Sequence, residues 1–226
     1  MRKEYKTAIA LLKYAPKLKL QIVMAVVFLA IGLFYDLLMR GQSAVGALYF
    51  ILPTSFLLQA FYATNLSGMI QTSSVRKKTH TLYPYIFTIP YVIIAYLLAA
   101  GFHAYLAVHG NLVVSYASNY AIQSRYMLFA GILFMVTIIY LAVGNKFFWS
   151  GLTLFVVGVL PPMIISQSRY TPRIFAFCEA SMLRCFVLGL VFTIVGCAVS
   201  YLLSVVFYKK DIAPIAMKQM ARTYLK

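Results

Sequence analysis

Residues 126–143 read YMLFAGILFMVTIIYLAV, an apolar run of 18 residues without a charged side chain. A helix needs about 20 mainly apolar residues to cross the hydrocarbon core of a bilayer, so this run is typical of a transmembrane helix. Five further apolar runs of comparable length lie before and after it. The sequence therefore predicts an all-α integral membrane protein with six transmembrane helices, at about 20–38, 44–70, 86–108, 126–143, 147–165 and 185–208.

The composition points to the same fold class. Of the 226 residues, 63% are hydrophobic and only 4 are acidic, and the mean hydropathy is +0.86. Charged residues make up 11% of the chain, whereas a water-soluble domain averages about a quarter. A soluble core of this size could not bury so many apolar side chains. We therefore expect a single transmembrane domain over residues 1–226, with lipid as its main solvent.

The basic residues lie in alternate gaps between the apolar runs. The N-terminal segment, the second and fourth loops and the tail at 209–226 hold fifteen of the 20 Lys and Arg residues, and the other gaps hold no Lys. By the positive-inside rule, this bias predicts a multi-pass chain with both termini in the cytoplasm. The net charge of +16 surrounds apolar runs instead of forming one basic domain, which argues against nucleic-acid binding.

Residues 1–19 form a basic amphipathic helix by their periodicity, and Pro16 is expected to end it. At 100° per residue the apolar face holds Tyr5, Ile9 and Leu12, and the basic face holds Lys6 and Lys13. Such a helix lies in the plane of the membrane interface with its apolar face toward the lipid. A solvated basic leader is the alternative.

The segment 166–184, between the fifth and sixth runs, mixes aromatic, aliphatic and charged residues. The two prolines before it are expected to end the fifth helix and to permit a re-entrant turn on the outer side. The residues of this possible external gate are Pro161, Pro162, Arg169, Arg173, Glu179 and Arg184. A plain external loop is the alternative.

Motifs for catalysis or metal binding are missing from the sequence. It contains no P-loop, no H-E-x-x-H and no G-x-S-x-G, and its three Cys residues have no metal-site spacing. An ion-coupled carrier should place acids near the middle of its spans, but Asp36 and Glu179 lie at outer ends. Asp36 and Arg40 are four residues apart, which favours a local ion pair. We therefore expect neither an enzyme nor a metal site.

Two pairs of glycines recur at helical spacing. Gly151 and Gly158 are seven residues apart, as are Gly189 and Gly196, so each pair lies on one helix face. Small residues at this spacing permit close approach of two backbones. Packing within one subunit and an interface between subunits both fit the pattern.

The loop between the second and third runs, SSVRKKTHTLYP at 73–84, is more structured than a charge anchor requires. Ser73 and Ser74 are expected to cap a short helix over 76–82, and Pro84 would separate this helix from the third span. With this loop, the basic N-terminal helix, the six spans and the segment 161–184, the chain resembles the small permease subunits of ABC type-2 exporters over nearly its whole length. Among them it is most similar to the permeases of exporters that expel phenol-soluble modulins, which are amphipathic toxic peptides.

The resemblance implies a transport subunit of a bacterial plasma membrane that pairs with a second permease, identical or paralogous. It implies a separate ATP-binding-cassette ATPase subunit that carries ATP and magnesium, and a cytoplasmic coupling helix that contacts it. The coupling residues are Ser73, Ser74, Arg76, Lys77, Lys78, Thr79 and His80. The expected cargo is an amphipathic or antimicrobial peptide, with an antibiotic or a lipid as alternatives. A membrane scaffold, an immunity or assembly factor, and an ion-coupled secondary carrier also remain open.

Overall fold

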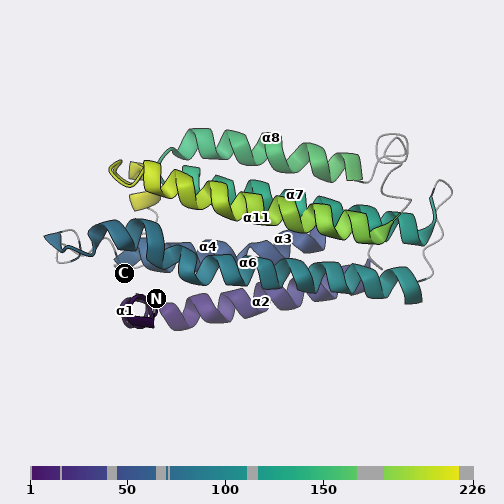
Figure 1. Ribbon diagram of the computed structural model, residues 1–226, viewed down its shortest axis with the longest axis horizontal. Coiled ribbons are helices and arrows are strands. Elements are labelled where there is room, and N and C mark those ends of the chain that lie inside the picture. Colours follow the sequence, from purple (N-terminus) through teal and green to yellow (C-terminus); the bar gives the residue numbers. More distant parts are fainter. Residues whose placement is uncertain are drawn as a thin grey trace.

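The computed structural model describes residues 2–15, 17–39, 45–64, 70, 72–110, 117–166 and 181–218, and this part of the chain is helical without a β-strand. Long helices run side by side, and α1 lies across them, so that Figure 1 shows it end-on. The helices are α1 (Arg2–Lys13), α2 (Leu18–Leu38), α3 (Val45–Ile51), α4 (Pro53–Thr64), α6 (Arg76–His109), α7 (Asn119–Gly144), α8 (Phe148–Ser166) and α11 (Met182–Val206).

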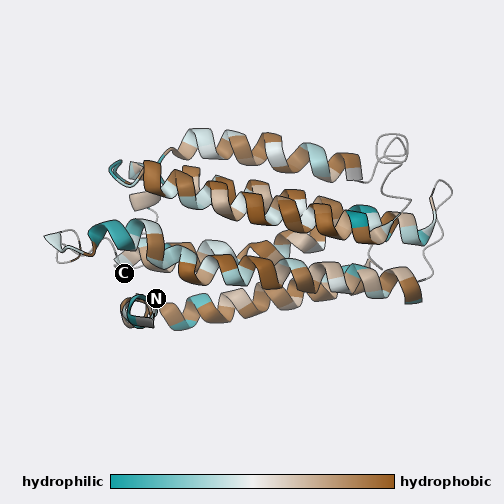
Figure 2. Cartoon of the chain, viewed as in Figure 1, coloured by the Kyte–Doolittle hydropathy of each residue, from teal (hydrophilic) through white to brown (hydrophobic). Residues whose placement is uncertain are grey.

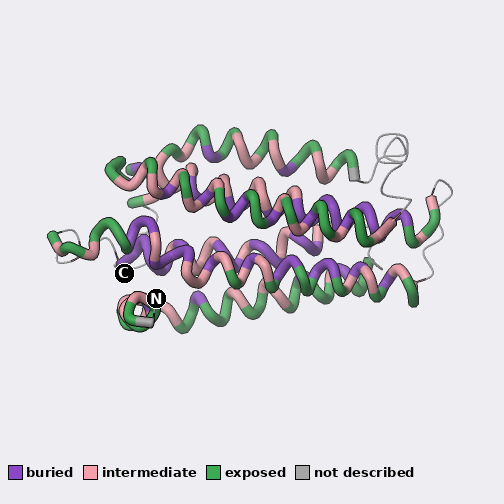
Figure 3. The backbone as a smooth tube through the Cα atoms, in the orientation of Figure 1, coloured by how far each residue is buried: buried purple, intermediate pink, exposed green. Residues whose placement is uncertain are grey.

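Within the described residues, six segments are long and apolar enough to cross a membrane, namely α2, α3 with α4, α6, α7, α8 and α11. Apolar residues extend along most of their length (Figure 2). The helices α2 and α8 expose most of their surface, whereas α7 is largely buried (Figure 3). The predicted class, an all-α protein of the multi-pass membrane kind, is therefore confirmed.

The change of direction between α1 and α2 occurs at Lys17. The first helix tightens at its end, where the N–H groups of Tyr14 and Ala15 donate to the carbonyls three residues earlier, of Leu11 and Leu12, at 3.0 and 2.9 Å. Lys17 then adopts a left-handed backbone with φ 55°, which is uncommon for a residue other than glycine. This conformation turns the chain from the transverse α1 into the first span.

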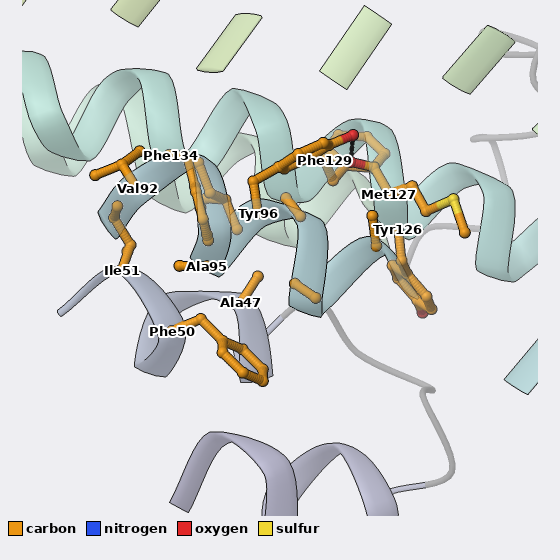
Figure 4. Close-up of a cluster of buried hydrophobic side chains, with 14 of the residues drawn as sticks. Ala47, Phe50, Ile51, Val92, Ala95, Tyr96, Tyr126, Met127, Phe129 and Phe134 are labelled. Atoms are coloured by element: carbon orange, nitrogen blue, oxygen red, sulfur yellow. Dashed lines mark hydrogen bonds between the residues drawn. The ribbon is translucent and has the colours of Figure 1, made fainter. Parts of the chain in front are cut away.

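The main core forms where α3 and α6 pack against α7. One buried cluster contains Phe50 and Ile51 of α3, Val92 and Tyr96 of α6, and aromatic and aliphatic side chains of α7 that include Phe134 (Figure 4). The Tyr96 hydroxyl donates to the carbonyl of Phe186 on α11 at 2.8 Å. A buried phenol therefore keeps a hydrogen-bond partner inside an otherwise apolar core.

The helices α7 and α11 pack backbone to backbone at glycines. A Cβ atom added to Gly131 would collide with the backbone of Gly189, and one added to Gly189 would lie 2.8 Å from the carbonyl oxygen of Met127. A Cβ atom on Gly196 would lie 2.6 Å from the Cα of Met135. The pair Gly189 and Gly196 therefore serves packing within the chain.

The other glycine pair joins α8 to α7. Gly151 faces the backbone of Gly144, and Gly158 faces the side chain of Val136. Both glycine pairs therefore pack helices within one subunit, which is one of the two alternatives that the spacing left open.

The short coupling helix predicted to end before Pro84 is not separate. The helix α6 runs for 34 residues from Arg76 through Pro84 and Pro90. The predicted serine cap is also wrong, because Val75 is the N-cap residue without a side-chain cap and the Ser73 hydroxyl donates to the carbonyl of Ile70 at 2.8 Å. A proline removes one helical hydrogen bond, and packing in a bundle of spans tolerates this loss.

Other predicted boundaries also shift. Pro161 and Pro162 lie inside α8 and do not end it, for the same reason. The loop expected up to Arg125 is shorter, because the Ser118 hydroxyl accepts a hydrogen bond from the Ala121 N–H at 3.2 Å and caps α7, which begins at Asn119, seven residues before the span expected from 126. The second span is interrupted at Leu52, before Pro53, and residues 65–69 of its expected last turns lie outside the described residues.

The predicted gate is described only in part. Arg169, Arg173 and Glu179, and with them the re-entrant turn, lie outside the described residues, as does Arg40. Arg184 lies in the first turn of α11, where its side chain is exposed and its backbone N–H donates to the capping hydroxyl of Ser181 at 3.4 Å.

Candidate functional site

Four segments meet at one end of the bundle, which we call the positive end. They are α1, the start of α6, the connector 145–147 between α7 and α8, and residues 207–218 after α11. The backbone N–H of Ala213 donates to the carbonyl of Asn145 at 2.9 Å, and the Lys146 ammonium donates to the carbonyl of Lys210 at 2.6 Å. The first turns of α6 are the most hydrophilic part of this end (Figure 2) and project beyond the other helices (Figure 1).

The first helix is attached to this end through Glu4. Its carboxylate lies 2.7 Å from the Lys78 ammonium and accepts a hydrogen bond from the Tyr83 hydroxyl at 2.9 Å. The hydrogen bonds from Lys78 and then Tyr83 hold the pKa of the Glu4 carboxyl below its ordinary value. Below these polar contacts, Ala8 is fully buried against Phe61 of α4 and Tyr83 of α6.

The other predicted residues of α1 divide between the bundle and its surroundings. Leu12 packs partly buried beside Ala8, and Ile9 is half-buried. The Tyr5 ring is about half exposed and lies 5.4 Å from the ring of Phe87. Lys6 and Lys13 are exposed. The transverse course of α1 agrees with an interfacial helix, while its seating in a membrane stays a prediction.

A pocket of about 350 Å³ opens beside the start of α6, and we call it the basic pocket. The Lys77 ammonium lies 5.3 Å from the centre of the Tyr208 ring, and the Lys209 ammonium lies 6.0 Å from the same centre. The residues that line the pocket are Ser73, Ser74, Arg76, Lys77, Tyr208 and Lys209. With three cations, three hydroxyl groups and no acid among its described lining residues, the pocket suits a carboxylate or phosphate group.

Lys146 adds a titratable group behind the basic pocket. Burial is the main reason that the pKa of its ammonium is lowered to about 8; the carboxylate of Asp211 opposes this shift and the positive charge of Arg76 adds to it. The charge of this end therefore depends on pH in the neutral to mildly alkaline range.

The structure separates the seven predicted coupling residues into three groups. Ser73, Ser74, Arg76 and Lys77 line the basic pocket, and Lys78 points to α1. Thr79 and His80 are buried instead. The Thr79 hydroxyl donates to the carbonyl of Arg76 at 2.7 Å, and the His80 ring lies 6.4 Å from that of Tyr62. Neither side chain is therefore accessible to another subunit.

Sequence reasoning missed the other half of the basic pocket. Tyr208 was expected to end the last span, and Lys209 and Lys146 were expected only to contribute to the charge bias that sets the topology. Their signal in the sequence is an aromatic residue and two lysines, Lys209 and Lys210, directly after an apolar run, which is also the ordinary pattern of a membrane boundary. Only the fold brings Tyr208 and Lys209 close to Lys77, which lies more than 100 residues earlier in the chain.

A buried polar cluster lies deeper in the bundle, below the positive end. The Tyr85 hydroxyl of α6 lies 2.9 Å from the Ser200 hydroxyl and 2.6 Å from the Ser204 hydroxyl, both on α11. The Ser200 hydroxyl in turn donates to the carbonyl of Ile138 on α7 at 3.0 Å. We call Tyr85, Ser200 and Ser204 the Tyr85 cluster. It joins the spans α6, α7 and α11 in the interior. Among the described residues, no group of three His, Cys, Asp or Glu could hold a metal ion.

These features define the class of protein as a multi-pass α-helical membrane protein with a basic, partly projecting polar end. A comparison with models of known protein families, with curated proteins and with solved structures finds no match.

Proposed function

We propose that the chain is the transmembrane permease subunit of an ATP-driven exporter. The observation that carries the proposal is the continuity of α6, which holds the basic pocket at its start and crosses the whole bundle. At about 1.5 Å per residue its 34 residues extend over about 51 Å, against a hydrocarbon core of about 30 Å, so about 20 Å of α6 lies outside the core. A soluble partner that grips this start therefore acts directly on a span.

The contacts of the positive end supply routes for such a movement. The Glu4–Lys78 ion pair ties α1 to the start of α6, and the cation–π contact of Lys77 with Tyr208 ties that start to the end of α11. Deeper in the bundle, the Tyr85 cluster links α6, α7 and α11. A displacement at the basic pocket would thus be shared by α1 and three spans.

In this proposal a separate ATP-binding-cassette subunit supplies ATP hydrolysis with its own ATP and magnesium, and this chain catalyses no reaction. Acidic side chains of that subunit bind in the basic pocket, because opposite charge and hydroxyl donors favour carboxylates there. Two permease copies form the pathway in a bacterial plasma membrane, with both termini in the cytoplasm. The cargo is an amphipathic or toxic peptide, and an antibiotic or a lipid is the alternative cargo.

The test is co-purification of the full chain with an ATPase from its native membrane, followed by measurement of ATP turnover with and without amphipathic peptide. We expect a stable complex whose turnover rises with peptide. The double variant Arg76→Glu with Lys77→Glu should lose the ATPase, whereas Lys13→Glu, which reverses an exposed charge of α1, should retain it. Absence of an ATPase and of stimulated turnover would favour a scaffold, an immunity factor or an assembly factor.

A specific observation favours a second candidate, an ion-coupled carrier. The Asp36 side chain is only 1% exposed, and among the described residues neither of its carboxylate oxygens has a hydrogen-bond partner. It lies against Gly46, where a Cβ atom would collide with the carboxylate. A buried acid in a span is costly and is often retained for transport. Uptake into vesicles driven by an ion gradient without ATP, and lost in Asp36→Asn, would support this candidate.

A further inference from the structure

An apolar crevice of about 450 Å³ lies between α6 and α11, away from the positive end. Its lining consists of Leu97, Ala100, Gly101 and Ala104 of α6, Met127 of α7, and Met182, Leu183 and Phe186 of α11. Ala100 and Met127 are 1% exposed, whereas Leu97 and Leu183 are 44% and 69% exposed. The crevice therefore runs from a buried floor to the outer surface of the bundle.

We propose that this crevice binds one acyl chain of a phospholipid in the surrounding bilayer. Both walls belong to spans, so the exposed rim formed by Leu97 and Leu183 faces hydrocarbon. At Gly101 a Cβ atom would have no heavy atom within 4 Å, which leaves an unfilled gap in the α6 wall. Close packing favours occupation of such a gap by an apolar chain.

The chemistry and size of the crevice select an acyl chain over a peptide. The described residues of its lining are all apolar, so an extended peptide would leave its N–H and C=O groups without partners. A helix about 10 Å across has a cross-section of about 80 Å², so 450 Å³ holds only about one helical turn. An acyl chain has no polar group to satisfy and is much narrower.

Residues at one end of the crevice fit the lipid headgroup. The Tyr120 hydroxyl accepts a hydrogen bond from the backbone N–H of Met182 at 3.0 Å, and the Tyr120 side chain is 44% exposed. Partly exposed tyrosines are typical of the headgroup level. Arg184 is exposed two residues further along α11 and supplies a cation for the phosphate. The acyl chain then extends from this level into the crevice.

The test uses the full chain in liposomes with a phosphatidylglycerol that carries a photoreactive diazirine on its acyl chain. After irradiation, mass spectrometry locates the adducts. We expect them to concentrate on the α6 and α11 peptides that line the crevice, above the level on the exposed face of α2. In Gly101→Leu, whose side chain fills the crevice, these adducts should fall to the α2 level, while Ala198→Leu, an exposed position of α11 outside the crevice, should leave them unchanged.

A second variant, Leu183→Asn, makes the exposed wall polar and should reduce the same adducts, so the test does not depend on the folding of Gly101→Leu. Arg184→Gln should reduce the preference for phosphatidylglycerol over phosphatidylcholine. Equal labelling of the crevice and α2 in the unmodified chain would overturn the proposal. Displacement of the adducts by added amphipathic peptide would also overturn it, and would assign the crevice to peptide.

Discussion

The Lys78 ammonium lies 2.7 Å from a carboxylate oxygen of Glu4, although 74 positions separate the two residues. This ion pair is where the transverse α1 meets the start of α6. Because the side chain of Glu4 also accepts a hydrogen bond from Tyr83, one acidic residue holds two points of the same helix. A movement of the start of α6 would therefore move α1 with it.

Reversal of one charge in this pair should loosen α1. In Glu4→Lys, two ammonium groups would face each other, and we expect a broader distance distribution between α1 and the start of α6. Nitroxide labels at the exposed positions Ala10→Cys and Ser74→Cys report that distance by double electron–electron resonance. The swapped pair Glu4→Lys with Lys78→Glu should restore the narrow distribution; failure of the swap would show that the attachment rests on the apolar contacts of Ala8 instead.

The same pair predicts a pH dependence. The pKa of Glu4 is lowered from its ordinary value of 4.5, so the attachment is fully present above that value and is lost only as the pH falls through the lowered pKa. The nitroxide distance should therefore remain narrow down to about pH 4.5 and broaden below it. Broadening between pH 7 and 5 would contradict the assignment to Glu4.

Lys146 should titrate well below an ordinary lysine, because burial lowers its pKa from 10.5 to about 8. Reductive methylation with ¹³C-formaldehyde and NMR would give the midpoint, with Lys146→Arg used to assign the signal. Removal of the nearby cation in Arg76→Gln should raise the midpoint, and removal of the carboxylate in Asp211→Asn should lower it. A midpoint near 10.5 would show that the ammonium is hydrated.

The effect of this pKa on the free energy of unfolding follows from the number of protons that the folded and unfolded chains bind. Between about pH 8 and 10.5 the unfolded chain holds the Lys146 proton more tightly than the folded chain does. The contribution of Lys146 to the free energy of unfolding therefore rises with pH in this window. In Lys146→Met this contribution should be absent, which a pH series of unfolding in mixed micelles would detect.

The glycine contacts between α7 and α11 should tolerate no side chain. In Gly131→Ala the new Cβ would meet the backbone of Gly189, which cannot move away as a flexible side chain could. Overpacking of this kind typically costs about 1–3 kcal/mol of unfolding free energy, and a backbone clash belongs at the upper end. Gly101→Ala is the matched control, since its Cβ meets nothing within 4 Å and should stabilise by roughly 0.5 kcal/mol. Equal effects of the two variants on unfolding in mixed micelles would contradict the close approach.

The positions of the spans could be predicted because each apolar run carries its own signal. Length and hydropathy located six spans, and the charge bias grouped the segments that meet at the positive end. Several of the errors occurred at prolines. Pro84, Pro161 and Pro162 are strong helix breakers in water, but in a bundle of spans the loss of one N–H is compensated by the remaining helix and its neighbours.

The contacts of the site could not be predicted because they join residues that are far apart in the chain. Periodicity places Gly189 on a helix face without saying that Gly131 faces it. Similarly, nothing local to Lys77 indicates Tyr208, and nothing local to Glu4 indicates Lys78. The buried partners of Tyr85 follow from the rotation of α11, which its nearly uniform apolar sequence does not specify.

Loss of the Tyr85 hydroxyl should weaken the attachment of α6 to α11, while the bond from Ser200 to the Ile138 carbonyl of α7 is retained. Tyr85→Phe keeps the ring but removes the bonds to Ser200 and Ser204, and side-chain hydrogen bonds between spans contribute about 0.6–2 kcal/mol each. We expect the free energy of unfolding in mixed micelles to fall by about 1–3 kcal/mol, because two serine hydroxyls lose a buried partner. Tyr105→Phe, which alters an exposed tyrosine of the same helix, should change it little. The double variant Tyr85→Phe with Ser204→Ala should lose less than the sum of the single variants, because the shared bond is already absent. Full additivity would show that Tyr85 and Ser204 act independently and would contradict the shared hydrogen bond.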